Sequence, residues 1–291
     1  MGQQADYSKQ YYVPHDSKWP IIAAVALFVF MQGMGNYFNG KPMGVYVSVA
    51  GAAMILYFVW NWFKDVINEN SAGVNNAQVD RSYRMGMGWF IFSEVMLFGV
   101  FFGALFYARQ YALPWLSGDG NNFFTNELLW KGFEGGWPSN GPENVGGAFN
   151  GMGPFWLPTI NTILLITSSF TLTIAHHRLL KNKMNEAYWW TMITVALGAI
   201  FMYCQVTEYI HAMEGLNLKL DTGIYGNTFY MLTGLHGLHV TLGALMLFIM
   251  AIRIKKGHFT PERHFGFMAA EWYWHFVDVV WILLYFFVYW V

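Results

Sequence analysis

One acidic residue interrupts a long apolar run near the middle of its length. The run FIFSEVMLFGVFFGALF covers residues 90–106 and carries Glu94. An ionisable residue inside a membrane span costs at least about 2.5–3.5 kcal/mol on insertion scales, so such residues face protein partners and often lie on proton pathways. Glu94 is therefore a candidate for proton exchange, with a purely structural role as the alternative.

Two further apolar runs carry ionisable residues at helical spacing. TGLHGLHVTLG places His236 and His239 three residues apart, and EWYWHFVDVVW places His275 and Asp278 three apart, with Glu271 one turn before them. Positions three or four apart share a helix face. These five residues are expected to form a buried polar network.

Three kinds of chemistry could use such a network. A metal site could draw ligands from His-x-x-His, His-x-x-Asp and a glutamate, but di-metal sites in helix bundles use paired Glu-x-x-His motifs, which this chain lacks. Its single cysteine, Cys204, cannot build a multi-thiolate centre. No metal site and no catalytic residue are predicted. A proton relay and a hydrogen-bond network that fixes helix packing both stay open.

The composition indicates the elements that must position these residues. Of 291 residues, 55% are hydrophobic and 20% aromatic, while 11% are charged, less than half of the roughly 25% usual in soluble proteins. This balance is typical of a membrane protein. A net charge of -1 gives no indication of nucleic-acid binding.

Seven stretches reach the roughly 20 apolar residues that a membrane-spanning helix needs. They are Trp19–Phe38, Met43–Phe63, Met85–Tyr107, Phe155–Ala175, Ala187–Tyr209, Tyr225–Ile252 and Ala269–Val291. The turn NGKP joins the first two closely, and a polar stretch follows them. We therefore expect an all-α polytopic membrane protein with a two-helix unit, residues 1–70, and a five-helix unit, residues 71–291.

Basic residues predict the orientation of the chain in the membrane. Segments on the amino-terminal side carry Lys9, Lys18, Lys64, Arg81, Arg84, Arg178, Lys181, Lys183, Arg253, Lys255, Lys256 and Arg263. These outnumber Lys41, Arg109, Lys131 and Lys219 on the other side. The amino terminus is expected in the cytoplasm and the carboxyl terminus outside, in the periplasm if the membrane is the bacterial inner membrane.

Two groups of residues at the membrane surfaces have simple explanations. His176, His177 and Arg178 follow the fourth stretch, where cations near a helix carboxyl end are favourable. The long outer loop, residues 108–154, carries more acidic than basic residues. It could meet a basic electron carrier, or it could be a solvated loop packed on a partner.

Several strings together resemble one protein family. RMGMGWFIFSEVMLFGVFFGALFYA, LPTINTILLITSSFTLTIAHHRLL, YGNTFYMLTGLHGLHVTLGALML and HFGFMAAEWYWHFVDVVWILLYFFVYW are similar to subunit III of cytochrome c oxidase, the haem-copper terminal oxidase. YYVPHDSKWPIIAAVALF and WNWFKDVINE extend the resemblance through the first two helices, in order and over nearly the whole chain.

The resemblance implies seven helices in two bundles, helices 1–2 and 3–7, around a V-shaped cleft that holds phospholipid. It implies a subunit without haem or copper that packs against subunit I, which carries the haem-copper oxygen-reducing centre. Subunit II of the assembly takes electrons from cytochrome c. Such a subunit supports proton uptake and sustained turnover in aerobic respiration.

The resemblance also implies roles for particular residues. Glu94 matches the carbodiimide-reactive acid of the family's SE motif. The lipid-contacting positions match Trp62, Glu69, Arg84, Gly86, Arg253 and Lys256. Many relatives carry a glutamate where this chain has Met268, and here Glu271 stands three residues later, on the same helix face. Asn75 stands where some relatives have a lipid-binding histidine.

Two alternatives remain beside this interpretation. One is subunit III of a quinol oxidase or of a system associated with nitric oxide reductase, although such relatives often lack the first two helices. The other is a proton-coupled membrane transporter that uses Glu94 and Asp278.

Overall fold

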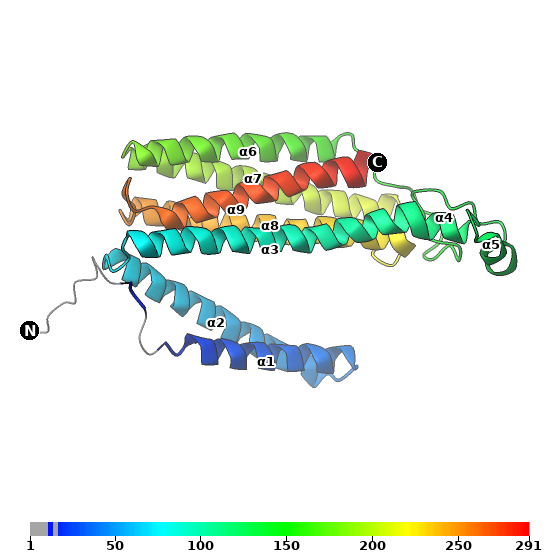
Figure 1. Cartoon of the computed structure of the whole chain (residues 1–291), viewed down its shortest axis with the longest axis horizontal. Helices are drawn as coiled ribbons and strands as arrows, with labels where there is room; N and C mark the ends of the chain where they lie inside the picture. Colours follow the sequence, from blue (N-terminus) through cyan, green and yellow to red (C-terminus); the bar gives the residue numbers. More distant parts are fainter. Residues whose placement is uncertain (1–10, 14–16, 291) are drawn as a thin grey trace, which may run out of the picture. The chain divides into compact units, whose positions relative to one another are not determined.

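The chain is described by a computed structural model that covers residues 11–13 and 17–290. Lys9, part of the YYVPHDSKWP motif and Val291 lie outside the described residues. Within the described part the regular structure is entirely helical, and seven helical segments are long and apolar enough to cross a membrane (Figure 1). The predicted all-α membrane class is confirmed.

The described residues divide into two compact units, one ending at Arg84 and the other beginning at Met85. In the first unit, α1 (Trp19–Phe38) and α2 (Met43–Ser71) form a helical hairpin through a turn that uses Gly40 at φ 73°. The hairpin is tight because its glycines let the backbones approach: a Cβ on Gly51 would lie 2.5 Å from Phe30 Cα. The indole N–H of Trp19 donates to Asp65 across 2.9 Å.

Several helices extend further than their apolar stretches. α2 continues to Ser71. α3 (Ala77–Tyr107) begins before Met85, and the Asn76 side chain fixes its start. Asn76 Oδ1 accepts hydrogen bonds from the backbone N–H groups of Gln78 and Val79, at 3.1 and 3.0 Å, the pattern of an N-cap. Windows of apolar residues locate the part of a helix that crosses hydrocarbon, not the polar turns beyond it.

The segment 108–154, expected to be an outer loop, is partly helical. α3 runs directly into a π-helical turn, η1 (Ala108–Ala112), and then into the short helix α4 (Leu113–Leu116); α5 (Phe123–Leu129) follows. Pro114 stands at the start of α4, the helical position where its missing N–H does least harm. Helix therefore continues past Tyr107, where the apolar stretch ends.

The second unit is built around four neighbouring helices. They are α6 (Leu157–Leu180), α7 (Met184–Gly215), α8 (Gly223–Lys255) and α9 (Phe265–Leu284), and α9 ends in the π-helical turn η2 (Tyr285–Trp290). α6 packs on α7, α7 on α8, and α9 on both α8 and α6. Figure 1 shows these helices running side by side.

Trp274 of α9 lies at the centre of this bundle and is fully buried. A Cβ added to Gly198 of α7 would lie 2.7 Å from the Trp274 ring, and one added to Gly243 of α8 would lie 2.9 Å from it. The indole N–H donates to Ser168 of α6 across 2.9 Å. One side chain therefore fixes the spacing of all four helices.

Aromatic side chains attach α3 to the same bundle. Phe98 of α3 meets Phe276 of α9 with ring centroids 6.1 Å apart, and Phe90 meets Tyr273 at 6.2 Å. These contacts bring the middle of α3, which carries Glu94, against α9.

Candidate functional site

Glu94 of α3 is paired with His239 of α8. Glu94 Oε2 lies 2.9 Å from His239 Nε2, and the two side chains are 17% and 8% exposed. The imidazole ring is held by Phe98, edge-on at 5.1 Å, and by Tyr273, stacked at 6.1 Å. The acid that interrupts the apolar run therefore faces a protein partner.

The second ring nitrogen of His239 determines what this pair can do. His239 Nδ1 lies 2.7 Å from the Leu235 carbonyl oxygen. A carbonyl only accepts, so Nδ1 carries a proton and Nε2 faces the carboxyl group. Either Glu94 is protonated and donates to Nε2, or an imidazolium donates to the Glu94 carboxylate. The pair shares one proton in both forms, which differ only in the partner that carries it.

A second polar group lies along the seam between α6 and α9. Glu271 Oε2 lies 2.5 Å from His176 Nδ1 of α6, and Glu271 Oε1 lies 3.8 Å from His275 Nε2. His275 Nδ1 in turn lies 2.6 Å from Ser169 Oγ and 4.0 Å from Asp278 Oδ2. The histidine at the end of α6 is thus bound to a buried carboxylate.

His236 is separate from both groups. It is 1% exposed, and its ring lies 5.1 Å from the Trp281 ring and 5.8 Å from the Phe201 ring. Neither ring nitrogen has a hydrogen-bond partner within the described residues. The five residues predicted as one network therefore fall into three places: His239 with Glu94, the α9 residues with α6, and His236 among aromatic rings.

Sequence reasoning missed a third polar group, near the carboxyl-terminal end of α7. Tyr289 of η2 donates to Glu208 Oε1 across 2.6 Å, and Asn161 of α6 donates to Gln205 across 3.4 Å. All four are buried. Gln205 and Glu208 stand three apart, the same helical spacing that singled out His236 and His239, so the spacing rule could have found them.

The described residues hold no group of three or more His, Cys, Asp or Glu side chains that could bind a metal ion. Hydrogen bonding and proton exchange are the chemistry that these polar groups can support.

Three of the positions matched to lipid contacts lie in the first unit. Trp62 stacks on Phe58 with ring centroids 5.6 Å apart. Glu69 accepts a hydrogen bond from Tyr12 at 3.2 Å, and Arg84 Nε bonds Asp80 across 2.7 Å. Asn75 lies in the turn between α2 and α3, with Nδ2 3.4 Å from Asn70 Oδ1.

The other three lie in the second unit. Gly86 of α3 has open space around it, and Lys256 at the end of α8 is exposed. Arg253 is only 8% exposed, its guanidinium lies 4.4 Å over the Phe259 ring, and its Nε has no hydrogen-bond partner in the part of the chain that the structure describes. A largely buried cation with an unused donor is suited to a phosphate group.

The pKa of the neighbouring His258 depends on the local electrostatic field. Burial lowers the pKa of His258, and the positive charges of Arg253 and Lys256 lower it further. The segment after α8 therefore carries a positive field that disfavours another cation and favours an anion.

Met268, where the resemblance implies a glutamate in many relatives, is buried in the bundle. Glu271, one turn later, is the residue that meets His176.

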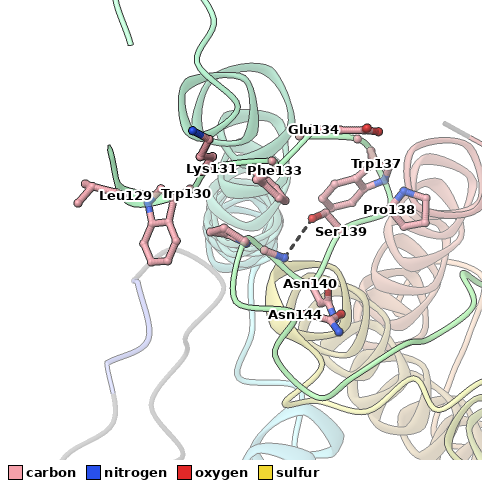
Figure 2. Close-up of a pocket in the computed structure, with 15 residues that line it drawn as sticks. Leu129, Trp130, Lys131, Phe133, Glu134, Trp137, Pro138, Ser139, Asn140 and Asn144 are labelled. Atoms are coloured by element: carbon pink, nitrogen blue, oxygen red, sulfur yellow. Dashed lines mark hydrogen bonds between the residues drawn. The ribbon is translucent and has the colours of Figure 1, made fainter. Parts of the chain in front are cut away.

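A pocket of about 570 Å³ lies in the segment 108–154, lined by residues 129–142 and Asn144 (Figure 2). Its wall is held by internal hydrogen bonds, from Gly141 N–H to Ser139 Oγ at 3.0 Å and from Asn140 to Asn144 at 2.7 Å. Lys131 is paired with Glu127 at 2.7 Å. Contact of this segment with a basic electron carrier stays a prediction.

Comparison with known proteins gives a consistent family match. The family model described as cytochrome c oxidase subunit III matches residues 9–115 and 134–291. The part left out includes α5. Cytochrome c oxidase subunit 3 of Latimeria chalumnae is 35% identical over 287 residues, 98% of each chain. The probable cytochrome c oxidase subunit 3 of Rickettsia felis is 33% identical over 285 residues, 97% of this chain and 95% of that protein.

These matches cover both units, the SE motif with Glu94, and the helices that carry His239, Glu271 and Asp278. The chain is an integral membrane protein and belongs to the cytochrome c oxidase subunit III family.

Proposed function

We propose that this chain acts as an accessory, cofactor-free membrane subunit of a proton-pumping cytochrome c oxidase. It stabilises subunit I, where haem and copper reduce oxygen to water, and it works beside subunit II, which takes electrons from cytochrome c. It also holds phospholipid and supports proton uptake, which prolongs turnover.

The observation that carries this proposal is the Glu94–His239 pair. A carboxyl group and an imidazole 2.9 Å apart, with the other ring nitrogen fixed on Leu235, hold one proton between them. Moving this proton from one partner to the other creates no net charge in the membrane interior, whereas releasing it leaves one carboxylate charge there, which is costly. The pair is suited to a subunit that supports proton uptake but carries no redox centre.

Phospholipid binding is supported by cationic groups at the end of α8. Arg253 is buried with a donor unused among the described residues, and Lys256 and His258 follow it. A lipid phosphate there would accept hydrogen bonds from the guanidinium and neutralise a buried charge.

The proposed orientation follows the excess of lysine and arginine on one side. It places the segment from Lys256 to His264 in the cytoplasm and the segment with α5 outside, in the periplasm of a bacterial inner membrane. Cysteine labelling tests this orientation. In a Cys204→Ser chain, a single cysteine is placed in one segment or the other and treated with a membrane-impermeant reagent in sealed cells. Labelling of the Lys256 side and protection of the α5 side would reverse the assignment.

The functional test is Glu94→Gln in the assembled oxidase. Glutamine fills the same space and can hydrogen-bond His239, so the complex should assemble, but it cannot release a proton. Initial oxygen consumption should be near normal, while activity should be lost after fewer turnovers and proton uptake should slow. Ser93→Ala is the matched control, because Ser93 is exposed and bonds only the Phe90 carbonyl of its own helix.

The result that would contradict this role is a Glu94→Gln oxidase with the same proton uptake and the same lifetime over many turnovers as the Ser93→Ala oxidase. Glu94 would then serve packing alone. Purification of the chain without any haem-containing partner, under conditions that keep other complexes intact, would contradict the subunit assignment itself.

The transporter alternative requires Glu94 and Asp278 to serve one path. The structure places them in different groups: Glu94 is bonded to His239, whereas Asp278 lies 4.0 Å from His275 at the α6–α9 seam. The electron donor of the purified complex tests the quinol oxidase alternative. We expect the complex to oxidise reduced cytochrome c, whereas oxidation of a quinol alone would favour the alternative.

A further inference from the structure

The seam between α6 and α9 holds a continuous line of titratable groups. Starting at the end of α6, His176 meets Glu271 at 2.5 Å and Glu271 meets His275 at 3.8 Å. His275 then lies 4.0 Å from Asp278. Each group in the line is therefore within about one hydrogen bond or one small side-chain movement of the next.

The hydrogen bonds along the seam allow protons to be exchanged between these groups. His176 Nδ1 and Glu271 Oε2 are close enough for a single shared proton, which sits on either partner. Ser169 Oγ lies 2.6 Å from His275 Nδ1. A hydroxyl both donates and accepts, so it accommodates neutral and protonated His275 alike.

Charge balance fixes how many protons the line holds. Two carboxylates and two neutral imidazoles carry a net charge of −2 together. The set becomes neutral when it binds two further protons. Burial penalises any unpaired charge, so the neutral set is favoured. Glu271 and Asp278 are each below one-tenth exposed, and neither Asp278 oxygen has a hydrogen-bond partner within the described residues.

Among the described residues, three ionisable side chains of α8 have contacts elsewhere, and the His264 ring stands beside His176 at 5.3 Å. From α8, His239 is bonded to Glu94, His236 lies on the Trp281 ring, and Arg253 lies over Phe259. The charged partners that act on Glu271 are His176 and His275, and the one that acts on Asp278 is His275.

The His275 side chain is 36% exposed, but it lies in the middle of a membrane-spanning helix, so the water-accessible end of the line is the His176 end. The His176 side chain is 19% exposed and stands in the last turns of α6, with the His264 ring 5.3 Å away, just before α9 begins. The neighbouring His177 is exposed and its Nδ1 bonds the Thr173 carbonyl of the same helix. Among the described residues, His176 is the group at the end of α6 that contacts Glu271.

We propose that the α6–α9 seam is a proton store, in which His176 exchanges protons with water and Glu271, His275 and Asp278 hold them. This is a second proton-binding site, separate from the Glu94–His239 pair. Protons move between carboxyl and imidazole groups that are already in place, with no redox step. It does not depend on the oxidase function proposed above.

The test uses the full chain in bilayer nanodiscs of phosphatidylcholine and phosphatidylglycerol, transferred from H₂O to D₂O. Infrared difference spectra follow the protonated carboxyl bands, and the band lost in Asp278→Asn is assigned to Asp278. Nitrogen-15 NMR follows the imidazole of His275. In the wild type both signals should exchange and respond to pH.

The informative variant is His176→Asn, which can still hydrogen-bond Glu271 but cannot titrate. Exchange at Asp278 and His275 should slow at least about tenfold, since a positioned proton-transfer group accelerates transfer by roughly 10²–10⁴-fold. His177→Asn is the matched control and should exchange at the wild-type rate.

Three results would overturn the proposal. They are unchanged exchange in His176→Asn, equal slowing in His177→Asn, or infrared and NMR signals of the seam that change neither in D₂O nor with pH. Because the nanodisc experiment needs no oxidase turnover, its failure leaves the Glu94 assay unaffected. A failed Glu94 assay likewise leaves the seam untouched.

Discussion

His239 holds the carboxyl group of Glu94 through Nε2 at 2.9 Å while its Nδ1 proton is committed to the Leu235 carbonyl at 2.7 Å. The imidazole can therefore meet Glu94 in only two protonation states, which differ by the position of one proton. This relationship joins α3 to α8 and links the stability of the second unit to the chemistry of its membrane-buried acid.

The pair should behave as a coupled unit in stability measurements. His239→Phe should lower the free energy of unfolding by about 1–3 kcal/mol, because it leaves the Glu94 carboxyl group buried without its partner. Adding Glu94→Leu should recover part of that loss, since replacing both partners by apolar groups is nearly neutral. Denaturation of the chain in detergent micelles gives the double-mutant cycle, and additive effects of the two changes would show that the pair is not coupled.

The spacing of α7 and α9 should be sensitive to one methyl group. Gly198→Ala would place a Cβ 2.7 Å from the Trp274 ring, and overpacking of this kind costs about 1–3 kcal/mol. Trp274 cannot move aside easily because its indole is bonded to Ser168.

Thermal unfolding of the purified chain measures this effect. Gly103→Ala is the control, because a Cβ there has open space and alanine favours helix over glycine. Equal thermal stability of the two variants would mean that the bundle relaxes around Trp274.

The positive field after α8 should be visible in the titration of His258. Its pKa is lowered by burial and then by Arg253 and Lys256, so removing a positive charge or adding a negative one should raise it. Lys256→Gln should therefore raise the His258 pKa, and so should bilayers that contain phosphatidylglycerol in place of phosphatidylcholine alone. Histidine NMR during a pH titration measures both.

The sign of this shift also bears on phospholipid binding. If phosphatidylglycerol raises the His258 pKa in the wild type but not in Arg253→Gln, the headgroup binds at the buried guanidinium. If both chains respond equally, the lipid acts through surface charge and no specific site is present there. Lys181→Gln, on a different loop, is the control for general charge effects.

The limits of sequence reasoning show clearly at Glu94, His176 and Glu208. Glu94 is recognisable from the sequence because a carboxyl group in a long apolar run is costly in a membrane and must face a protein partner. Its partner is not, since His239 is 145 residues away in the chain and four other histidines and acids had similar spacing. His176 fits a cation at a helix end, and only the packing of α9 shows that it meets Glu271. Glu208 is the second-last residue of the apolar stretch Ala187–Tyr209, so it passes for a residue at the membrane surface.

Local sequence patterns are enough to predict the all-α membrane class, the seven spans and the ionisable residues that lie inside them. These depend on local quantities: the length of apolar runs, the cost of a charge in hydrocarbon and helical spacing. Tertiary structure decided which partners those residues obtain. Helix packing placed Glu94 on His239, Glu271 between His176 and His275, and His236 among aromatic rings, because neighbours across a bundle depend on the rotation and depth of each helix, which one-dimensional spacing does not define.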